Sequence, residues 1–365
     1  MSSLGLGLGV NRFFGKGQIT PSLSTLFRQR VLEDNGTFEG KACLQDLINQ
    51  GLFDNDNFVL TPNGYKAGKL YALKPENGDL DVTWVRNGNA TRVNQNGLIE
   101  SVGNNVPRLD YLNGNCPSIL VEPQRTNLNA NNNLNTITNN VFSGSSYSNK
   151  EVLLNELGVL NMYLADQSPQ SSLNAATFFN GSNNFNAFET ITTDFILRRP
   201  ENENWDFFGL NLTFVPIVAV VFDLNNLTFV SSSSVASNIN IVKLNETDFY
   251  ISINMTSDSD TFSQFSQYRI GIADGLNTNP SVIGGRFGIS GFSFANDNNG
   301  LQSIIPTTGS AVTRPSDAPI PIPVPAGTTE IVEVMQDETI NIITNLLPTY
   351  TIPFGRFKYI LFNGA

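Results

Sequence analysis

The spacing of apolar runs constrains this chain most. Between residues 150 and 300, short runs rich in β-branched and aromatic residues recur about every 10 to 15 residues, separated by Asn, Gly, Ser or Asp. Examples are FETITTDFILRR, which begins at Phe188, and DFYISINMTS, which begins at Asp248. Such runs are typical of strands joined by tight turns. The pattern predicts a central antiparallel β-sandwich or jelly roll.

The composition fits a mainly all-β protein with a substantial core. Hydrophobic residues make up 40% of the 365 residues, and 26 of them are Phe. Asn accounts for about one residue in eight, and it favours turns because it tolerates left-handed backbone. A chain of this length is expected to contain two or three modules.

Charge and residue usage exclude several classes of protein. The net charge is −11, and no basic stripe is present, so neither nucleic acid nor an anionic membrane is an expected partner. The absence of His excludes Ser-His-Asp catalysis and His-ligated zinc. No apolar segment is long enough to span a bilayer, and no secretory signal is expected. Cys43 and Cys116 are too few for a disulfide framework, so we expect both to be reduced and buried.

The chain divides into five segments by composition. A Gly-alternating start predicts an anchoring arm, with a frayed terminus as the alternative, and apolar residues at helical spacing over 41–53 predict one short helix. The prolines of PSDAPIPIPVP predict a polyproline spacer. The expected segments are an arm and anchoring region (1–64), an N-terminal β unit (65–130), the sandwich body (131–314), a proline-rich linker (315–327) and a small C-terminal β unit (328–365). The last unit is too small to bury its own core, so we expect it to dock or to oligomerise.

Two Asn-Gly turns punctuate the N-terminal β unit. NGN at 87–89 predicts a hairpin between the strands on either side of it, and QNG at 95–97 predicts a second tight turn.

Two phrases nearly two hundred residues apart carry a family resemblance. The first signature, Ala90–Leu128, contains ATRVNQNGLIE, then NVPRLDY, then ILVEPQRTNL. The second signature, Gln302–Asp317, reads QSIIPTTGSAVTRPSD. Together they resemble the opening and closing phrases of a family of bacteriophage fibre, head-spike and adhesion-type structural proteins. Ile304 and Ile305 stand where that family has Ser-Tyr, and residues 129–150 depart from it.

The resemblance implies a non-catalytic component of a tailed-phage virion. Such a fibre, spike or decoration protein is assembled in the bacterial cytoplasm and contacts other virion proteins. It is commonly a homo-oligomer, for which a trimer is expected. Host-surface glycan is a further expected partner. The alternatives are a receptor-binding lectin-like module and a polysaccharide depolymerase.

The charged residues of the signatures are expected to form a structural network rather than a ligand site. Arg pairs with carboxylates through two parallel hydrogen bonds, which favours Arg over Lys in such networks. We expect local pairing within the first signature and a separate pair between Arg314 and Asp317. The expected network residues of the first signature are Arg108, Asp110, Glu122 and Arg125.

Candidate ligand sites are sparse. Aromatic residues in polar surroundings could stack on sugar rings, and Trp205 and Tyr268 are the candidates, with Tyr147 and Tyr163 in similar surroundings. No cofactor is expected. The acidic and Asn-rich clusters at 54–57, 258–260, 274 and 296–299 could bind calcium, but none is a complete calcium loop, and plain turns are the alternative.

Overall fold

The computed structural model describes eleven stretches and five single residues of the chain. These are 58–66, 69–73, 81–129, 132–133, 146–171, 189–212, 218–231, 236–256, 268–278, 280–297 and 299–364, with Cys43, Leu47, Asn49, Asn135 and Phe142. The predicted arm, and all but three residues of the helix predicted over 41–53, lie outside them. In the described part, all named elements are strands and all their pairings are antiparallel, which confirms the all-β class. The described part of the chain contains no helix that is long and apolar enough to cross a membrane.

The predicted sandwich is present. One sheet has six strands in the order β15-β16-β11-β18-β10-β9, and the other has four in the order β14-β13-β12-β17. The strands of the larger sheet are β9 (Tyr147–Leu157), β10 (Leu160–Gln167), β11 (Thr190–Arg198), β15 (Ala236–Lys243), β16 (Asp248–Thr256) and β18 (Gly285–Ala295). Those of the smaller sheet are β12 (Phe207–Leu212), β13 (Val218–Asp223), β14 (Thr228–Ser231) and β17 (Tyr268–Ala273).

Alternating apolar residues of the two sheets form the sandwich core. Phe195 of β11, Phe208 of β12 and Phe222 of β13 are fully buried there, and so is Phe287 of β18. Their rings make edge-on or stacked contacts, such as the 5.2 Å centroid separation of Phe208 and Phe287. Burial of these large apolar surfaces is the main force that holds the two sheets together. We call residues 146–297 the sandwich lobe.

A third sheet, of nine strands, brings together the two ends of the described chain. Its main path runs β20-β3-β2-β1-β25-β22-β23, and β7, which pairs with β25, carries β6 at its other side. The strands are β1 (Phe58–Lys66), β2 (Lys69–Leu73), β3 (Val82–Val85), β6 (Arg108–Asp110), β7 (Ser118–Val121), β20 (Ala318–Pro319), β22 (Glu330–Met335), β23 (Ile340–Ile343) and β25 (Gly355–Asn363). We call this the sheet lobe; its core includes Leu60, Trp84 and Phe362.

The proline-rich segment is not the free spacer expected from its sequence. Ala318 and Pro319 pair with β3, and β21 (Ile322–Pro323) pairs with β24 (Thr349–Tyr350). Proline is tolerated there because these two-residue strands need few backbone N–H donors.

The C-terminal residues do not form a unit of their own either. β25 pairs with β1 and with β7, so residues 328–364 complete the sheet lobe. The expected docking therefore takes place within the chain, because so short a segment cannot bury a core alone.

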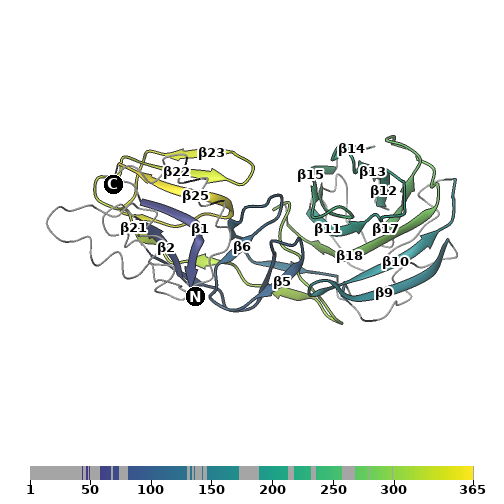
Figure 1. Ribbon diagram of the computed structural model, residues 1–365, viewed down its shortest axis with the longest axis horizontal. Helices are drawn as coiled ribbons and strands as arrows, with labels where there is room; N and C mark the ends of the chain where they lie inside the picture. The colour runs from purple at the N-terminus through teal and green to yellow at the C-terminus, as the bar shows by residue number, and fades with distance from the viewer. Residues whose placement is uncertain are drawn as a thin grey trace, which may run out of the picture.

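The sandwich lobe is an insertion into the sheet lobe. The chain passes to the sandwich after β8 (Arg125–Asn127) and returns before β19 (Val312–Arg314), and these two strands pair with each other. Figure 1 shows the two lobes side by side along the long axis, with β5 (Ile99–Val102) and β6 between them. A third apolar cluster lies at the junction and contains Ile99 and Ile304 of the signatures.

The two cysteines form a disulfide, which corrects the expectation that they are reduced. Cys43 and Cys116 are 73 residues apart in sequence, with their Cα atoms 5.6 Å apart. Cys116 is half-buried rather than a core residue. The bond ties the region before β1 to the turn between β6 and β7.

Candidate functional site

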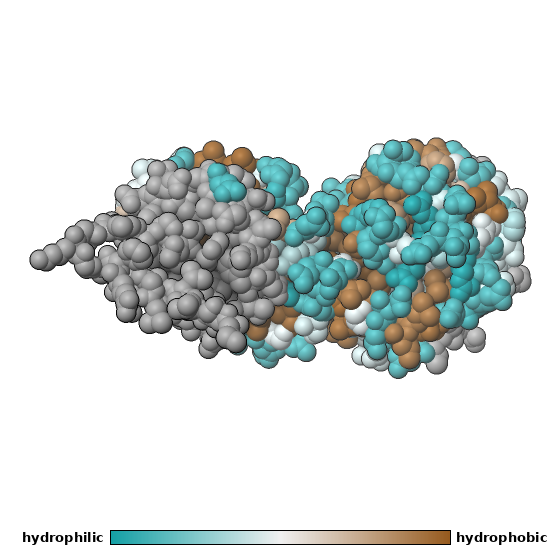
Figure 2. Space-filling view, viewed as in Figure 1, coloured by the Kyte–Doolittle hydropathy of each residue, from teal (hydrophilic) through white to brown (hydrophobic). Residues whose placement is uncertain are grey.

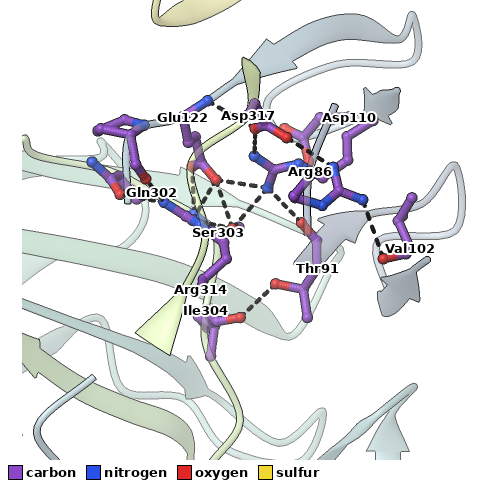
Figure 3. Close-up of polar contacts among 12 residues, drawn as sticks. Arg86, Thr91, Val102, Asp110, Glu122, Gln302, Ser303, Ile304, Arg314 and Asp317 are labelled. Atoms are coloured by element: carbon purple, nitrogen blue, oxygen red, sulfur yellow. Dashed lines mark hydrogen bonds and ion pairs between the residues drawn. The ribbon is translucent and has the colours of Figure 1, made fainter. Parts of the chain in front are cut away.

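Glu122 lies at the centre of a buried ion-pair network at the lobe junction. Its Oε2 atom accepts hydrogen bonds from Arg108 Nη1 at 2.7 Å and from Arg314 Nη1 at 2.5 Å. Ser303 donates to the same carboxylate from its backbone nitrogen and from its hydroxyl group, each at 2.7 Å. Figure 3 shows Glu122 of the first signature beside Ser303 and Arg314 of the second. The first signature therefore supplies the carboxylate, and the second supplies two of its partners.

Asp317 is the second centre of the network. Its Oδ1 atom accepts hydrogen bonds from Arg86 Nη1 at 2.8 Å and from the indole nitrogen of Trp84 at 3.2 Å. Its Oδ2 atom accepts from Arg108 Nη2 and, at 2.9 Å, from the backbone nitrogen of Glu122. Arg108 thus bridges the two carboxylates. The expected ion pair between Arg314 and Asp317 does not form. Arg314 pairs with Glu122 of the first signature. Asp317 accepts hydrogen bonds from Arg108 of the first signature, from Trp84 of β3 and from Arg86 directly after β3.

Asp110 extends the network to the C-terminal strand. It accepts hydrogen bonds from the backbone nitrogen of Val93 at 2.8 Å and from Arg356 Nε of β25 at 3.0 Å. Arg356 Nη1 also donates to the carbonyl oxygen of Leu301 at 2.9 Å. Arg356 therefore ties the sheet lobe to the segment that leaves the sandwich.

Arg125 belongs to a different cluster from the one expected. Its Nη1 atom lies 2.6 Å from Asp194 of β11, and its Nε atom lies 3.1 Å from Asp297. Arg125 and Asp194 are 3% and 0% exposed. This residue therefore joins the first signature to the outer face of the sandwich, rather than pairing within the signature.

Burial and the neighbouring arginines shift the pKa values of these carboxyl groups in opposite directions. Burial alone would raise the pKa of Glu122, but the guanidinium groups of Arg314, Arg108 and Arg356 hold it well below its usual value. Burial raises the pKa of Asp194 to about 6, although Arg125 opposes the shift. A fully buried carboxylate is stable only when enough positive charge surrounds it. Glu122 meets this condition with three arginines, and Asp194 has one.

The hairpin of β4 (Ala90–Val93) and β5 (Ile99–Val102) packs closely on the sandwich. Gly158, with φ of +77°, forms a backbone bridge to Ile99, and a Cβ atom there would overlap the Ile99 carbonyl. Gly97, with φ of +75°, approaches the carbonyl oxygen of Leu244 in the same way. Only glycine combines this backbone conformation with so close an approach. Gly97 of the first signature therefore has two roles: it forms the turn of the hairpin, and it allows the hairpin to pack closely on the sandwich.

Sequence reasoning missed several members of the network. Arg86 and Trp84 precede the first signature, and Arg356 follows the second by almost forty residues. Arg86 Nη1 and Nη2 also donate to the carbonyl oxygens of Val106 and Val102, at 3.1 and 3.3 Å. The one available signal was the position of Arg86 directly after the apolar strand β3, since a buried arginine is nearly always paired. Arg356 gave no such signal, because it is 16% exposed and its strand also carries Lys358.

Three of the four expected aromatic ligand residues, Trp205, Tyr147 and Tyr163, are not available for stacking. Trp205 is 3% exposed, belongs to the sandwich core, and donates its indole N–H to the carbonyl oxygen of Arg286 at 3.1 Å. Tyr147 and Tyr163 are buried as well. The side chain of Tyr268 lies outside the described residues. The expectation of a glycan site on Trp205 is therefore wrong, because the ring points inward from a polar loop.

The acidic clusters that the structure describes serve turns and ion pairs. Asp274 accepts a hydrogen bond from the backbone nitrogen of Ser281 at 3.1 Å, and Asp297 accepts one from Thr192 at 2.7 Å. Across the described stretches, no three His, Cys, Asp or Glu residues form a group that could hold a metal ion. The clusters at 54–57 and 258–260 lie outside the described residues.

A polar pocket of about 530 Å³ opens on the sandwich lobe. Arg199 forms part of its wall and donates to the carbonyl oxygen of Trp205 and to the side chains of Asp206 and Asn225, at 3.1 to 3.2 Å. The other lining residues are mainly hydrogen-bond acceptors: Pro200, Glu201, Glu203, Asn204, Glu246 and Thr247.

Comparison with known protein families and with curated proteins finds no match to this chain.

Proposed function

We propose that this chain is a non-catalytic structural component of a tailed-phage virion, of the fibre, spike or decoration type. Its partners are other virion proteins and further copies of itself, and its location is the virion. The sheet lobe fixes the chain to the particle, and the inserted sandwich lobe is presented for assembly or host-surface contact.

One observation carries the proposal. The residues that carry the resemblance to phage structural proteins are those that interlock at the base of the inserted lobe. Glu122 and Arg108 come from the first signature and Arg314 from the second, and all three side chains are at most 4% exposed. Side chains that are buried and paired with one another leave no room for a ligand, which supports a structural role for both phrases.

A decisive test is antibody-gold labelling of intact phage particles, viewed by electron microscopy. Label on the capsid supports a head fibre or decoration protein, and label on the tail supports a tail fibre or spike. If particles are unlabelled both intact and after mild disruption, the proposal is wrong.

A second candidate function is glycan binding in the polar pocket beside Arg199. Its lining offers several carboxylate and amide acceptors, which suit the hydroxyl donors of a neutral sugar better than an anionic one. Titration of host polysaccharide fragments into the protein, followed by NMR, tests this. Saturable shifts that disappear when Asn204 and Asn225 are both replaced by Ala would support it, and unchanged spectra would exclude it.

A further inference from the structure

The strand β23 is an exposed sheet edge. It lies at one end of the nine-stranded sheet, and within the described residues it pairs with β22 alone. Ile340 and Ile342 are 60% and 57% exposed. In Figure 2, apolar surface gathers along the top of the left lobe, where Figure 1 places β23. A free edge with apolar side chains is a template for pairing with another strand.

The two exposed residues continue an apolar row across the sheet. Ile342 lies opposite Val332 of β22, and Val332 lies opposite Leu361 of β25. Val332 and Leu361 are themselves half-buried. A strand added beside β23 would extend this row and shield Ile340 and Ile342 from water.

The outer strands of the two sandwich sheets, and β20 at the opposite end of the main path of the nine-stranded sheet, are protected in ways that β23 is not. β9 carries Lys150, Glu151 and Glu156, and its pairing with β10 has two register shifts. β15 carries Lys243, β17 carries Arg269 and β20 ends in proline. β14 is uncharged, but it contacts β15. β23 reads INII, without charge or proline, and pairs with β22 in regular register.

The lack of charge at β23 favours a second copy of this chain as the partner of this edge. Two copies of a chain with net charge −11 repel wherever their acidic surfaces meet. β23 itself carries no charge, so self-pairing brings no like charges together within the strand. Glu333, which lies opposite Asn341 of β23, is buried and accepts hydrogen bonds from Asn341 and Tyr350. Glu338, just before the strand, is paired with Lys358. Antiparallel self-pairing also satisfies the free N–H and C=O groups of both edges.

We propose that β23 pairs antiparallel with β23 of a second copy across a two-fold axis, which joins two nine-stranded sheets into one. This contact favours a dimer over the trimer that the family resemblance implies. It does not depend on the proposed virion location.

The test is the mass of the full-length protein in solution, measured by light scattering and by sedimentation equilibrium. Wild-type protein is expected at twice the chain mass of 39.9 kDa. Ile342→Lys places a charge on the edge and is expected to return the protein to the single-chain mass, with at least a tenfold weaker self-association. Because Ile342 is 57% exposed, this variant is expected to keep the wild-type circular dichroism spectrum.

Leu154→Lys is the matched control. Leu154 is 56% exposed on β9, an edge strand of the sandwich, so the control adds the same charge at the same exposure on a different edge. It is expected to leave the wild-type mass unchanged. A monomeric wild type, a threefold mass, or a mass that Ile342→Lys does not lower would each overturn the proposal.

Discussion

Glu122 accepts a hydrogen bond from Arg314 at 2.5 Å, although the two residues are 192 positions apart in the chain. Between them the chain builds the whole sandwich lobe. The pair therefore closes the base of an inserted domain, and the network around it fixes how the two lobes meet.

Replacing Glu122 with Gln is expected to destabilise the protein strongly. The change leaves Arg108 and Arg314 buried without their shared carboxylate, and removal of one partner from a buried ion pair costs roughly 3–5 kcal/mol. Urea denaturation followed by circular dichroism measures the loss. Glu246→Gln is the control, because that side chain is 93% exposed and should leave the denaturation midpoint unchanged. A Glu122→Gln midpoint within error of wild type would contradict the network's role.

Asp194 gives the stability a pH dependence of defined sign. Its folded pKa, raised to about 6 from 3.8, means that the folded state holds this proton more tightly than the unfolded state. This contribution is therefore fully present below about pH 4 and is lost as the pH rises through about 6.

The variant Asp194→Asn cannot ionise, so its stability relative to wild type should improve between pH 4 and pH 7. A shift of about two pKa units corresponds to at most ~3 kcal/mol. Thermal melting of both proteins across this range gives the difference at each pH. If the stability of Asp194→Asn relative to wild type does not change with pH, or falls as the pH rises, burial does not raise the pKa of Asp194.

The disulfide should contribute measurably to stability. A bond that closes a loop of this kind typically adds roughly 2–4 kcal/mol, because it restricts the unfolded chain. The variant in which Cys43 and Cys116 are both Ser should lose that amount in urea denaturation. Thiol titration of the unreduced, denatured wild type should find no free thiol, and two thiols per chain would restore the expectation of reduced cysteines.

Gly158 should not tolerate Ala. The substitution adds strain at positive φ and an overlap with the Ile99 carbonyl, and overpacking of this kind typically costs roughly 1–3 kcal/mol. Gly300→Ala is the control for strain alone, since Gly300 has φ of +67° and open space around it. Thermal melting should therefore rank wild type, Gly300→Ala and Gly158→Ala in falling order. Equal losses for the two variants would argue against close packing of the hairpin on the sandwich.

The emission of the two tryptophans should report buried rings. Trp84 is 1% and Trp205 is 3% exposed, so native fluorescence should be blue-shifted and resistant to quenching by iodide. Efficient quenching that host polysaccharide prevents would instead restore Trp205 as an exposed sugar-stacking residue.

Sequence patterns predicted the sandwich well because its strands follow local rules. The runs around Phe195 and Ile251 alternate inward and outward, and the turns between them carry Asn, Gly or Asp. QNG was also interpreted correctly, because a tight turn does join β4 and β5. NGN at 87–89 misled, since β3 pairs with β2 and β20 rather than with β4. An Asn-Gly turn indicates where the chain reverses, not which strand will be its neighbour.

For the same reason, local sequence patterns could not identify the partners of residues that pair over long distances in the chain. Arg125 and Asp110 were expected to pair nearby, yet their partners are Asp194 and Arg356, which only the folded topology brings close. Cys43 and Cys116 meet for that reason as well. Trp205 sits among polar neighbours in sequence, but its ring fills the core. Residue type showed that the signature charges matter, and topology decided which of them pair.

The most direct test of the account is a double-mutant cycle on Glu122 and Arg314. The stabilities of Glu122→Gln, Arg314→Gln and the double variant are compared with wild type by urea denaturation. Because the two side chains share one buried network, the losses should be strongly non-additive, with a coupling free energy of at least ~2 kcal/mol. Losses that add to within ~0.5 kcal/mol would show that the two signatures do not interlock as described.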